Sequence, residues 1–148
     1  MNKIIIAMIG SFLFLISCKT ENSKDREHVR LVFDAGGLQF IASSLNTKKE
    51  TMSALYGNSQ ALQSLSNKND KPLPGTKMKL VTWKYHENPQ YTGGTITGEL
   101  VSVETVETGI KGSVSYRKEL DNEKEPGIFQ TKEQRIQYMM GYQPVVMP

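Results

Sequence analysis

Apolar residues recur at helical spacing directly after Asn58. Ala61, Leu62 and Leu65 fall on one face of a helix that would begin there. Asparagine is suited to cap this helix, because its side-chain oxygen can accept a hydrogen bond from the free backbone N–H groups of the first turn. Polar residues, two prolines and a glycine dominate positions 67–75, and we expect the helix to end there.

A second helix is predicted near the end of the chain. Thr131 is followed three residues later by Gln134, which is the spacing of a capping box, in which each side chain bonds the other residue's backbone N–H. Gly141 would end this helix. Its apolar face would consist of Ile136, Met139 and Met140.

Five stretches have the composition or the alternation of β-strands. The one over Thr76–Tyr85 contains no proline or glycine and includes Met78, Leu80, Val81, Trp83 and Tyr85, which suits a strand with apolar neighbours on both faces. It includes Trp83, the only tryptophan, which we expect to be buried against the helices. The five stretches are Val29–Phe33, Leu38–Leu45, Thr76–Tyr85, Glu99–Thr108 and Ser113–Leu120.

Alternation along two of these strands assigns side chains to faces. In Leu38–Leu45, Phe40 and Ala42 would share one face, with Ile41 and Ser43 on the other. In Glu99–Thr108, the face that carries Leu100 and Val106 also carries Glu104, whereas Val101 and Val103 take the opposite face. Glu104 is therefore either a polar group at the edge of the sheet, which we favour, or a carboxylate that enters a cavity.

The remaining segments are predicted as connections and one short helix. Lys49–Tyr56 could form a short helix that carries Met52, Leu55 and Tyr56. Asp34–Gly37 reads as a turn, His86–Gly98 as a long hairpin loop and Asp121–Gly127 as a charged surface loop. Together the elements predict one α+β domain over residues 29–148, with an antiparallel sheet of about five strands and two or three packed helices.

The first residues form an export signal that precedes the domain. Asn2 and Lys3 come before an uncharged run of 13 residues, Ile4–Ile16, which is typical of a signal peptide and too short to span a bilayer. Leu15-Ile16-Ser17-Cys18 then matches a lipobox, in which the cysteine thiol receives a diacylglycerol and the chain is cut before it. Residues 1–17 are thus predicted to be removed.

Lipidation would anchor the mature chain to a bacterial membrane. Acyl chains such as palmitate contribute about 0.8 kcal/mol per buried CH₂, so that two or three chains hold firmly. Residues 18–28 form a polar tether, and His28 at its end is expected to be solvated. The alternative is an ordinary secretory signal that leaves Cys18 as a free thiol, which is unusual in an exported protein. The predicted location is the cell envelope, at the outer membrane or a periplasmic face.

Charge gives little indication of a partner. The chain carries 18 Lys and Arg against 15 Asp and Glu, and the formal net charge is +3. Basic residues are spread among acidic ones along the sequence, without the basic stripe that nucleic-acid binding requires. We expect no nucleic-acid partner.

The order of motifs from Gln39 onward resembles the cytochrome P-460 family, most closely lipoprotein members from Bacteroidetes-type bacteria. The likeness rests on order and spacing, and on no single specific motif. It is carried by Leu55-Tyr56-Gly57-Asn58, Leu73-Pro74-Gly75-Thr76, the Trp83 strand, Ser102-Val103-Glu104, Arg135-Ile136-Gln137-Tyr138 and the terminal Val146-Met147-Pro148. The resemblance implies the fold, and it also implies that two copies can pair as a homodimer.

The chain departs from the family at both covalent links to haem. Family members known as cytochromes carry Cys-x-x-Cys-His near the C-terminus, whereas Cys18 is the only cysteine here. The family's haem-crosslinking lysine lies five residues after the glycine of the Pro-Gly turn, and that position is Leu80. Lys79 is adjacent, but on a strand it would face the other side. The resemblance therefore implies a P-460-like domain without covalent haem.

Candidate chemistry is sparse. There is no Gly-x-Ser-x-Gly, Cys-x-x-Cys or His-Glu-x-x-His motif, and His28 and His86 are the only histidines, so that a histidine-rich metal site is excluded. The pocket candidates are Trp83, His86 and Glu104. These observations favour a binding domain over an enzyme, and no cofactor is expected.

Two other interpretations stay open. In the first, haem is held non-covalently in a redox or gas-binding protein, with an axial ligand from His86, Met139, Met140 or a tyrosine. Methionines at helical spacing are more often core residues. In the second, the chain is a structural envelope lipoprotein with no small ligand.

Overall fold

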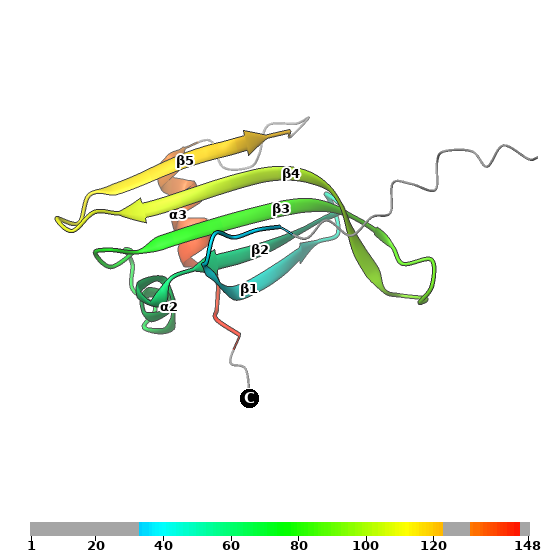
Figure 1. Cartoon of the computed structure of the whole chain (residues 1–148), viewed down its shortest axis with the longest axis horizontal. Coiled ribbons are helices and arrows are strands. Elements are labelled where there is room, and N and C mark those ends of the chain that lie inside the picture. Colours follow the sequence, from blue (N-terminus) through cyan, green and yellow to red (C-terminus); the bar gives the residue numbers. More distant parts are fainter. Residues whose placement is uncertain (1–32, 123–130, 146–148) are drawn as a thin grey trace, which may run out of the picture.

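The computed structural model describes residues 33–122 and 131–145. Its elements are β1 (Gln39–Asn46), β2 (Thr51–Gly57), α2 (Ser59–Ser66), β3 (Lys77–Glu87), β4 (Thr95–Thr108), β5 (Val114–Asp121) and α3 (Lys132–Met140). The strands form one antiparallel sheet in the order β1-β2-β3-β4-β5, in which each strand pairs with the next along the chain (Figure 1). The predicted α+β class, with an antiparallel sheet of five strands, is confirmed.

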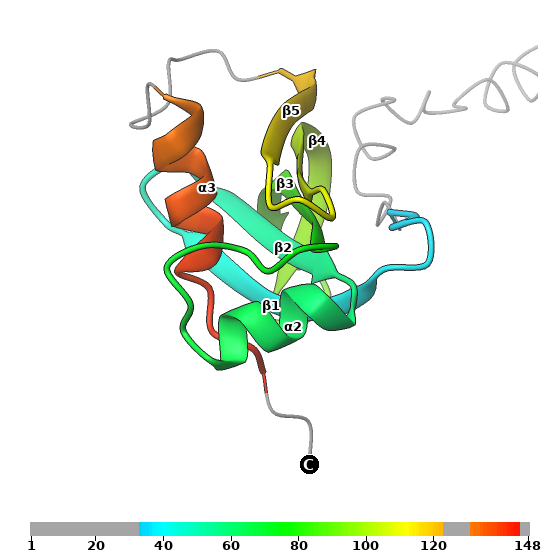
Figure 2. The ribbon, with the colours of Figure 1, turned by 90° about the vertical axis from the view of Figure 1, so that its left-hand side faces the viewer.

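Both helices lie on the same side of the sheet, and residues 33–38 lie on the other side (Figure 2). We call these sides the helix side and the open face. The main core fills the helix side, because every second residue of the strands meets apolar residues of the helices there. Its buried members are Ile41, Ala42, Leu55, Ala61, Leu65, Met78, Leu80, Val106, Met139, Met140 and Tyr142.

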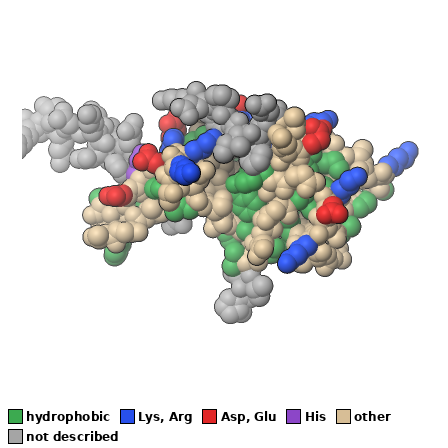
Figure 3. All heavy atoms as spheres, turned by 180° about the vertical axis from the view of Figure 1, so that it is seen from behind, with side chains coloured by type: hydrophobic (Ala, Val, Ile, Leu, Met, Phe, Trp, Pro, Cys, Tyr) green, Lys and Arg blue, Asp and Glu red, His purple; other side chains and the backbone are tan. Residues whose placement is uncertain are grey.

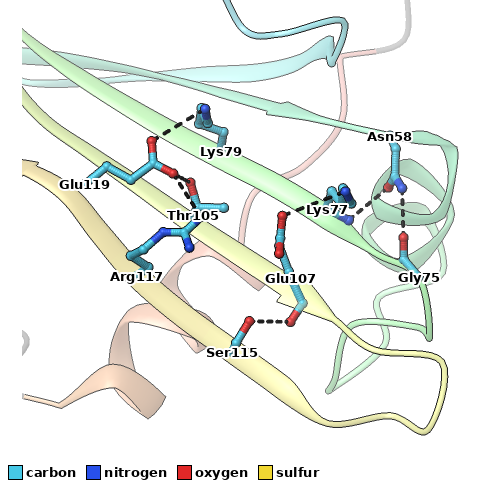
Figure 4. A network of polar contacts seen from close by, with 9 residues as sticks. All are labelled: Asn58, Gly75, Lys77, Lys79, Thr105, Glu107, Ser115, Arg117 and Glu119. Carbon is cyan, nitrogen blue, oxygen red and sulfur yellow. Dashed lines mark hydrogen bonds and ion pairs between the residues drawn. The ribbon is translucent and has the colours of Figure 1, made fainter.

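The Asn58 cap also fixes α2 to the sheet. As expected, the Asn58 side-chain oxygen accepts a hydrogen bond from Ala61 N at 3.0 Å, and it accepts a second one from Lys77 N at 3.1 Å. Asn58 Nδ2 donates to Gly75 O at 2.8 Å (Figure 4). Gly75 has a φ of 80°, the left-handed value that the third residue of this Pro-Gly turn needs. One side chain thus joins the helix start to the turn before β3.

The capping box of α3 is confirmed. Gln134 N donates to Thr131 Oγ1 at 3.3 Å, and Thr131 N donates to the Gln134 side-chain oxygen at 3.3 Å. Met139 and Met140 are buried as the predicted apolar face, and the partly buried Ile136 packs against the same core. After the helix, Val145 N donates to Ile41 O at 2.9 Å, so the last described residues lie along the edge of β1.

The prediction of a short helix over Lys49–Tyr56 is wrong, because Thr51–Gly57 is strand β2. This strand lies between β1 and β3 and hydrogen-bonds to both. Both of its faces are largely buried, so the sequence shows no clean alternation of polar and apolar residues. The strand ends at Gly57, where the chain packs closely. A Cβ atom added at this position would lie 2.6 Å from Ala61 Cβ and 2.7 Å from Ile41 Cδ1, so a residue with a side chain would clash there.

Two assignments of side chains to faces are also corrected. A register shift between Phe40 and Ala42 buries both Ile41 and Ala42 in the helix-side core, whereas Phe40 stacks against Tyr56 on the open face. A bulge is a local insertion, and it breaks the strict alternation from which the faces were predicted. For the same reason, shifts around Trp83 place Leu100 on the open face, away from Val106.

The loop expected over His86–Gly98 is shorter than predicted. Strand β3 continues to Glu87 and β4 begins at Thr95, so the connection covers residues 88–94 and is the plain hairpin that we favoured. The turn at Asp34–Gly37 is confirmed, with Gly36 and Gly37 at φ of 66° and 80°. Residues 29–32 of the first expected strand, and most of the Asp121–Gly127 loop, lie outside the described residues.

Candidate functional site

Glu104 is the most deeply buried charged side chain that the structure describes. It lies in the middle of β4 on the helix side, where it pairs across the sheet with Leu80 of β3 and Lys118 of β5. Only 2% of its surface is exposed. The prediction of a polar group at the sheet edge is therefore wrong, since β4 is flanked by strands on both sides. A buried carboxylate is costly unless it is paired and hydrogen-bonded.

Arg135 of α3 and Tyr116 of β5 provide these partners, and we call the three residues the Glu104 cluster. Arg135 Nε donates to Glu104 Oε2 at 2.7 Å, and a second guanidinium nitrogen of Arg135 donates to Glu104 Oε1. The Tyr116 hydroxyl donates to Oε2 at 2.7 Å. This bidentate arginine–carboxylate geometry is the strongest form of side-chain ion pair. It joins two strands and a helix that are distant in sequence.

The surroundings of the cluster fix its protonation state. Burial, together with the hydrogen bond to Glu104 and the negative charge of Glu104, raises the pKa of Tyr116 well above its ordinary value. Burial alone would lower the pKa of Arg135, but the hydrogen bond and the charge of Glu104 outweigh it and raise that pKa. Tyr116 is thus a neutral donor and Arg135 a permanent cation. The guanidinium also lies 4.8 Å from the centre of the Tyr138 ring.

Hydroxyl groups continue the polar region from α3 toward β1. The Tyr138 and Tyr142 hydroxyl oxygens are 3.3 Å apart, and the Tyr142 hydroxyl is 2.7 Å from Ser44 Oγ. Burial raises the pKa of Tyr142, which keeps this phenol neutral. Ser53 and Thr82 form a further pair at 2.8 Å on the neighbouring strands. The helix side therefore has a polar half near α3 in addition to its apolar core.

Leu80, which the resemblance to the cytochrome P-460 family aligns with a haem-crosslinking lysine, belongs to the apolar half. Leu80 has 0% exposure and lies in one core cluster with Leu55, Met78 and Met139. Met139 and Met140, both candidates for an axial haem ligand, are buried in this same cluster, as expected for methionines at helical spacing. Side chains thus occupy the space above Leu80.

The three pocket candidates do not come together. Trp83 lies on the open face, in a cluster with Ala54, Val81 and Val103, so the expectation that it packs against the helices is wrong. Glu104 lies on the helix side. His86 is exposed near the end of the β3–β4 hairpin, with its imidazole over Gly98, where a Cβ would lie 2.5 Å from Nε2.

The open face has a polar border on its β5 side. Glu119 accepts a hydrogen bond from Thr105 Oγ1 at 3.0 Å, and it forms ion pairs with Lys79 at 3.6 Å and Arg117 at 3.3 Å (Figure 4). Burial would raise the pKa of Glu119, but these partners outweigh it and lower that pKa. On the helix side, acidic and basic side chains are interspersed (Figure 3). Neither arrangement forms a basic stripe.

Sequence reasoning missed Arg135 and Tyr116 as partners of Glu104. Two features of the sequence could have indicated them. Arg135 lies next to Ile136 and three residues before Tyr138, on the helix face that packs on the sheet, and Tyr116 lies on the apolar side of its strand. Lys118 lies directly opposite Glu104 in the pairing of β4 with β5. Predicting which of these residues contacts Glu104 requires the register of β4 with β5, which the sequence alone does not supply.

The part of the chain that the structure describes holds neither a cluster of metal ligands nor a membrane-spanning helix. No three His, Cys, Asp or Glu side chains of residues 33–122 and 131–145 gather as metal ligands. No helix among those residues is long and apolar enough to cross a membrane. His28 and Cys18 lie outside these ranges.

No protein-family model matches the chain, and no curated protein matches it.

Proposed function

We propose that the protein is a membrane-anchored bacterial lipoprotein whose cytochrome P-460-like domain is a binding or accessory module of the cell envelope without covalent haem. The observation that carries the proposal is Cys18, the only thiol of the chain, at the end of the lipobox. A thiol that bears lipid is not available for a thioether bond to haem. The anchor would hold the domain beside the membrane, where an exported module meets its partners.

The arrangement of the helix side supports a module that binds rather than one that catalyses. Glu104 accepts hydrogen bonds from two side chains and is buried, so its oxygens are committed to holding α3 on the sheet. A general acid or base needs access to the proton that it moves. The filled core around Leu80 also supports a domain without a haem crosslink, because leucine offers no nucleophile.

Lipidation of Cys18 is expected to be visible as a mass increment. Intact-mass analysis of protein purified from the envelope should give a chain that begins at Cys18 and carries a diacylglycerol and one further acyl group. Cys18→Ala should block processing and leave the signal attached. A mature chain from Cys18 without acyl groups would contradict this prediction, as would a Cys18→Ala variant that is cleaved yet stays on the membrane.

Any haem in the protein is expected to be removable. Neither Cys18 nor Leu80 can bond the macrocycle, so a haem could be held only by one axial ligand and apolar contacts. The absorption spectrum of protein purified from its own envelope tests for a Soret band, and a binding module without haem should show none. If a band is present, acid-acetone should extract it. Haem that stays with the denatured polypeptide on a gel would contradict the alignment of Leu80 with the family's lysine.

A further inference from the structure

Residues 131–145, which we call the α3 segment, are attached to the sheet mainly through side chains. Among the described residues, one backbone hydrogen bond joins this segment to the rest of the fold, from Val145 N to Ile41 O at 2.9 Å. The strands, in contrast, are joined to one another by backbone ladders. Side chains of the segment make further polar contacts, which pair Arg135 with Glu104, Gln137 with Asp70 and Tyr142 with Ser44. The α3 segment can therefore leave the sheet without breaking a strand pairing.

Helix α2 is held more firmly to its neighbouring strand. Asn58 N donates to Lys77 O at 3.1 Å, and the Asn58 side chain bonds Lys77 N and Gly75 O. Within the helix, Ser64 Oγ accepts a hydrogen bond from Leu73 N at 3.0 Å. Because α2 lies between β2 and β3 along the chain, it cannot leave without moving the turn that leads into β3. The α3 segment follows all five strands, so it carries no such constraint.

The Glu104 cluster links the charge of Glu104 to the position of α3. While α3 is docked, Glu104 is 2% exposed and receives two bonds from Arg135. A carboxylate left in this site without the guanidinium would carry a large desolvation cost. Departure of the whole helix avoids that cost, because it opens the helix side of the sheet to water. The ion pair can thus separate without leaving a buried charge only when α3 moves as a unit.

Apolar contacts oppose this movement and keep it rare. Met139 is 0% exposed, and Met140 and Tyr142 are 8% and 9% exposed in the helix-side core. Helix α3 has nine residues. An isolated helix of this length is not stable in water, so a helix that leaves the sheet would also unfold.

We propose that the α3 segment is a gate over the helix side, which opens by local unfolding while the five strands and α2 stay folded. The Arg135–Glu104 ion pair and the burial of Met139 hold the gate closed, with α3 lying over the sheet (Figure 2). Opening would uncover Leu80 of the same core cluster together with Glu104. One consequence rests on the proposed function. Because side chains fill the helix-side core in the closed state, a ligand of the binding module would enter this core only in the open state.

Native-state hydrogen exchange, followed by mass spectrometry on the full mature chain in detergent, tests the gate. Peptides that cover α3 are expected to exchange at least about tenfold faster than peptides that cover β3, because they exchange through the local opening. As the urea concentration approaches the unfolding midpoint, the two rates should converge, since global unfolding then exposes both elements.

Two substitutions act on the two openings separately. Trp83 packs on the open face whether the gate is open or closed, so Trp83→Ala should speed exchange in β3 by about a hundredfold and leave α3 unchanged within about twofold. Val81→Ala, in the same cluster, is the milder version. Arg135→Met destabilises the closed state and should speed exchange in α3 by about a hundredfold. Lys77→Met removes an exposed ion pair and should change neither rate by more than about fivefold.

Equal exchange rates in α3 and β3 of the unaltered protein would overturn the proposal. A rise of both rates together in Trp83→Ala or Val81→Ala would overturn it too, because α3 would then open only when the whole domain unfolds. An α3 rate that Arg135→Met leaves unchanged would exclude the ion pair as the contact that holds the gate closed. The measurement needs no ligand, haem or acyl group, so a failure of the proposed function would leave this result unaffected.

Discussion

Replacing Arg135 by methionine is expected to lower the free energy of unfolding by about 3–5 kcal/mol, the cost of removing one partner from a buried ion pair. Glu104 is 2% exposed and would lose both bonds to the guanidinium, which leaves Tyr116 as its only side-chain donor among the described contacts. Because 22% of the Arg135 side chain is exposed, water can reach part of the site. The lower end of the range is therefore expected. Urea denaturation followed by circular dichroism measures the change.

An exposed ion pair between β3 and β4 provides the control. Lys77 and Glu107 are 3.9 Å apart, with 61% and 45% of their side chains exposed. Lys77→Met should change the free energy of unfolding by about 0–1 kcal/mol, because solvent already screens the pair. A loss from Lys77→Met as large as that from Arg135→Met would show that removal of a surface charge, rather than burial of Glu104, causes the effect.

A double variant tests whether the stability lost in Arg135→Met comes from the carboxylate of Glu104 that is left without its partner. In Glu104→Leu with Arg135→Met, both charges are gone and apolar groups fill the site, so most of the stability lost by Arg135→Met should return. The residual cost would come mainly from the Tyr116 hydroxyl, which would lose its acceptor. A double variant no more stable than Arg135→Met would contradict the view that an uncompensated carboxylate is the source of the loss.

The sequence predicted the elements with strong local signals. Asn58 and Thr131 are followed by apolar residues at helical spacing, and both caps form as expected. Thr76–Tyr85 was recognisable because it carries several large apolar residues and is not interrupted by proline or glycine. Such signals can be read from the sequence, because a helix cap or an apolar run depends only on residues a few positions apart.

The strands of the sheet are not all the expected ones. Of the expected strand Val29–Phe33, residues 29–32 lie outside the described residues. Lys49–Tyr56 was predicted as a helix, whereas Thr51–Gly57 is strand β2, between β1 and β3. Burial of that strand on both faces hides the alternation that identifies a half-buried strand. The bulge at Phe40 and Ala42 likewise depends on pairing with β2, which no local pattern encodes.

The site was the least predictable part. Glu104 was recognised as unusual because it lies among apolar residues of its strand, but Trp83 was assigned to the wrong side of the sheet. Its side follows from the alternation along β3, in which Val81 and Trp83 share the open face and Met78 and Leu80 the helix side. The bond from Arg135 to Glu104 joins residues that are 31 positions apart, and it depends on how α3 lies over the sheet.

Trp83→Ala is expected to lower the free energy of unfolding by about 3–5 kcal/mol, the range for large aromatic residues truncated in a core. The indole is 5% exposed and packs with Val81, Val103 and Phe33 on the open face. Removing it would leave a cavity and an unsupported Phe33. Circular dichroism during urea unfolding measures the loss, since the variant has no tryptophan to follow. Tyr91→Ala is the control, because that ring is 70% exposed and its loss should cost less than about 0.5 kcal/mol.

A double-mutant cycle decides on which side of the sheet Trp83 acts. Met139 belongs to the helix-side core and Trp83 to the open-face cluster, and these two clusters have no described residue in common. Separate sites add to within about 0.3–0.5 kcal/mol, so the costs of Trp83→Ala and Met139→Ala should sum in the double variant. If Trp83 packed against the helices, the two losses would overlap and the coupling would exceed that margin. Emission typical of an exposed indole in the native protein would contradict burial on either side.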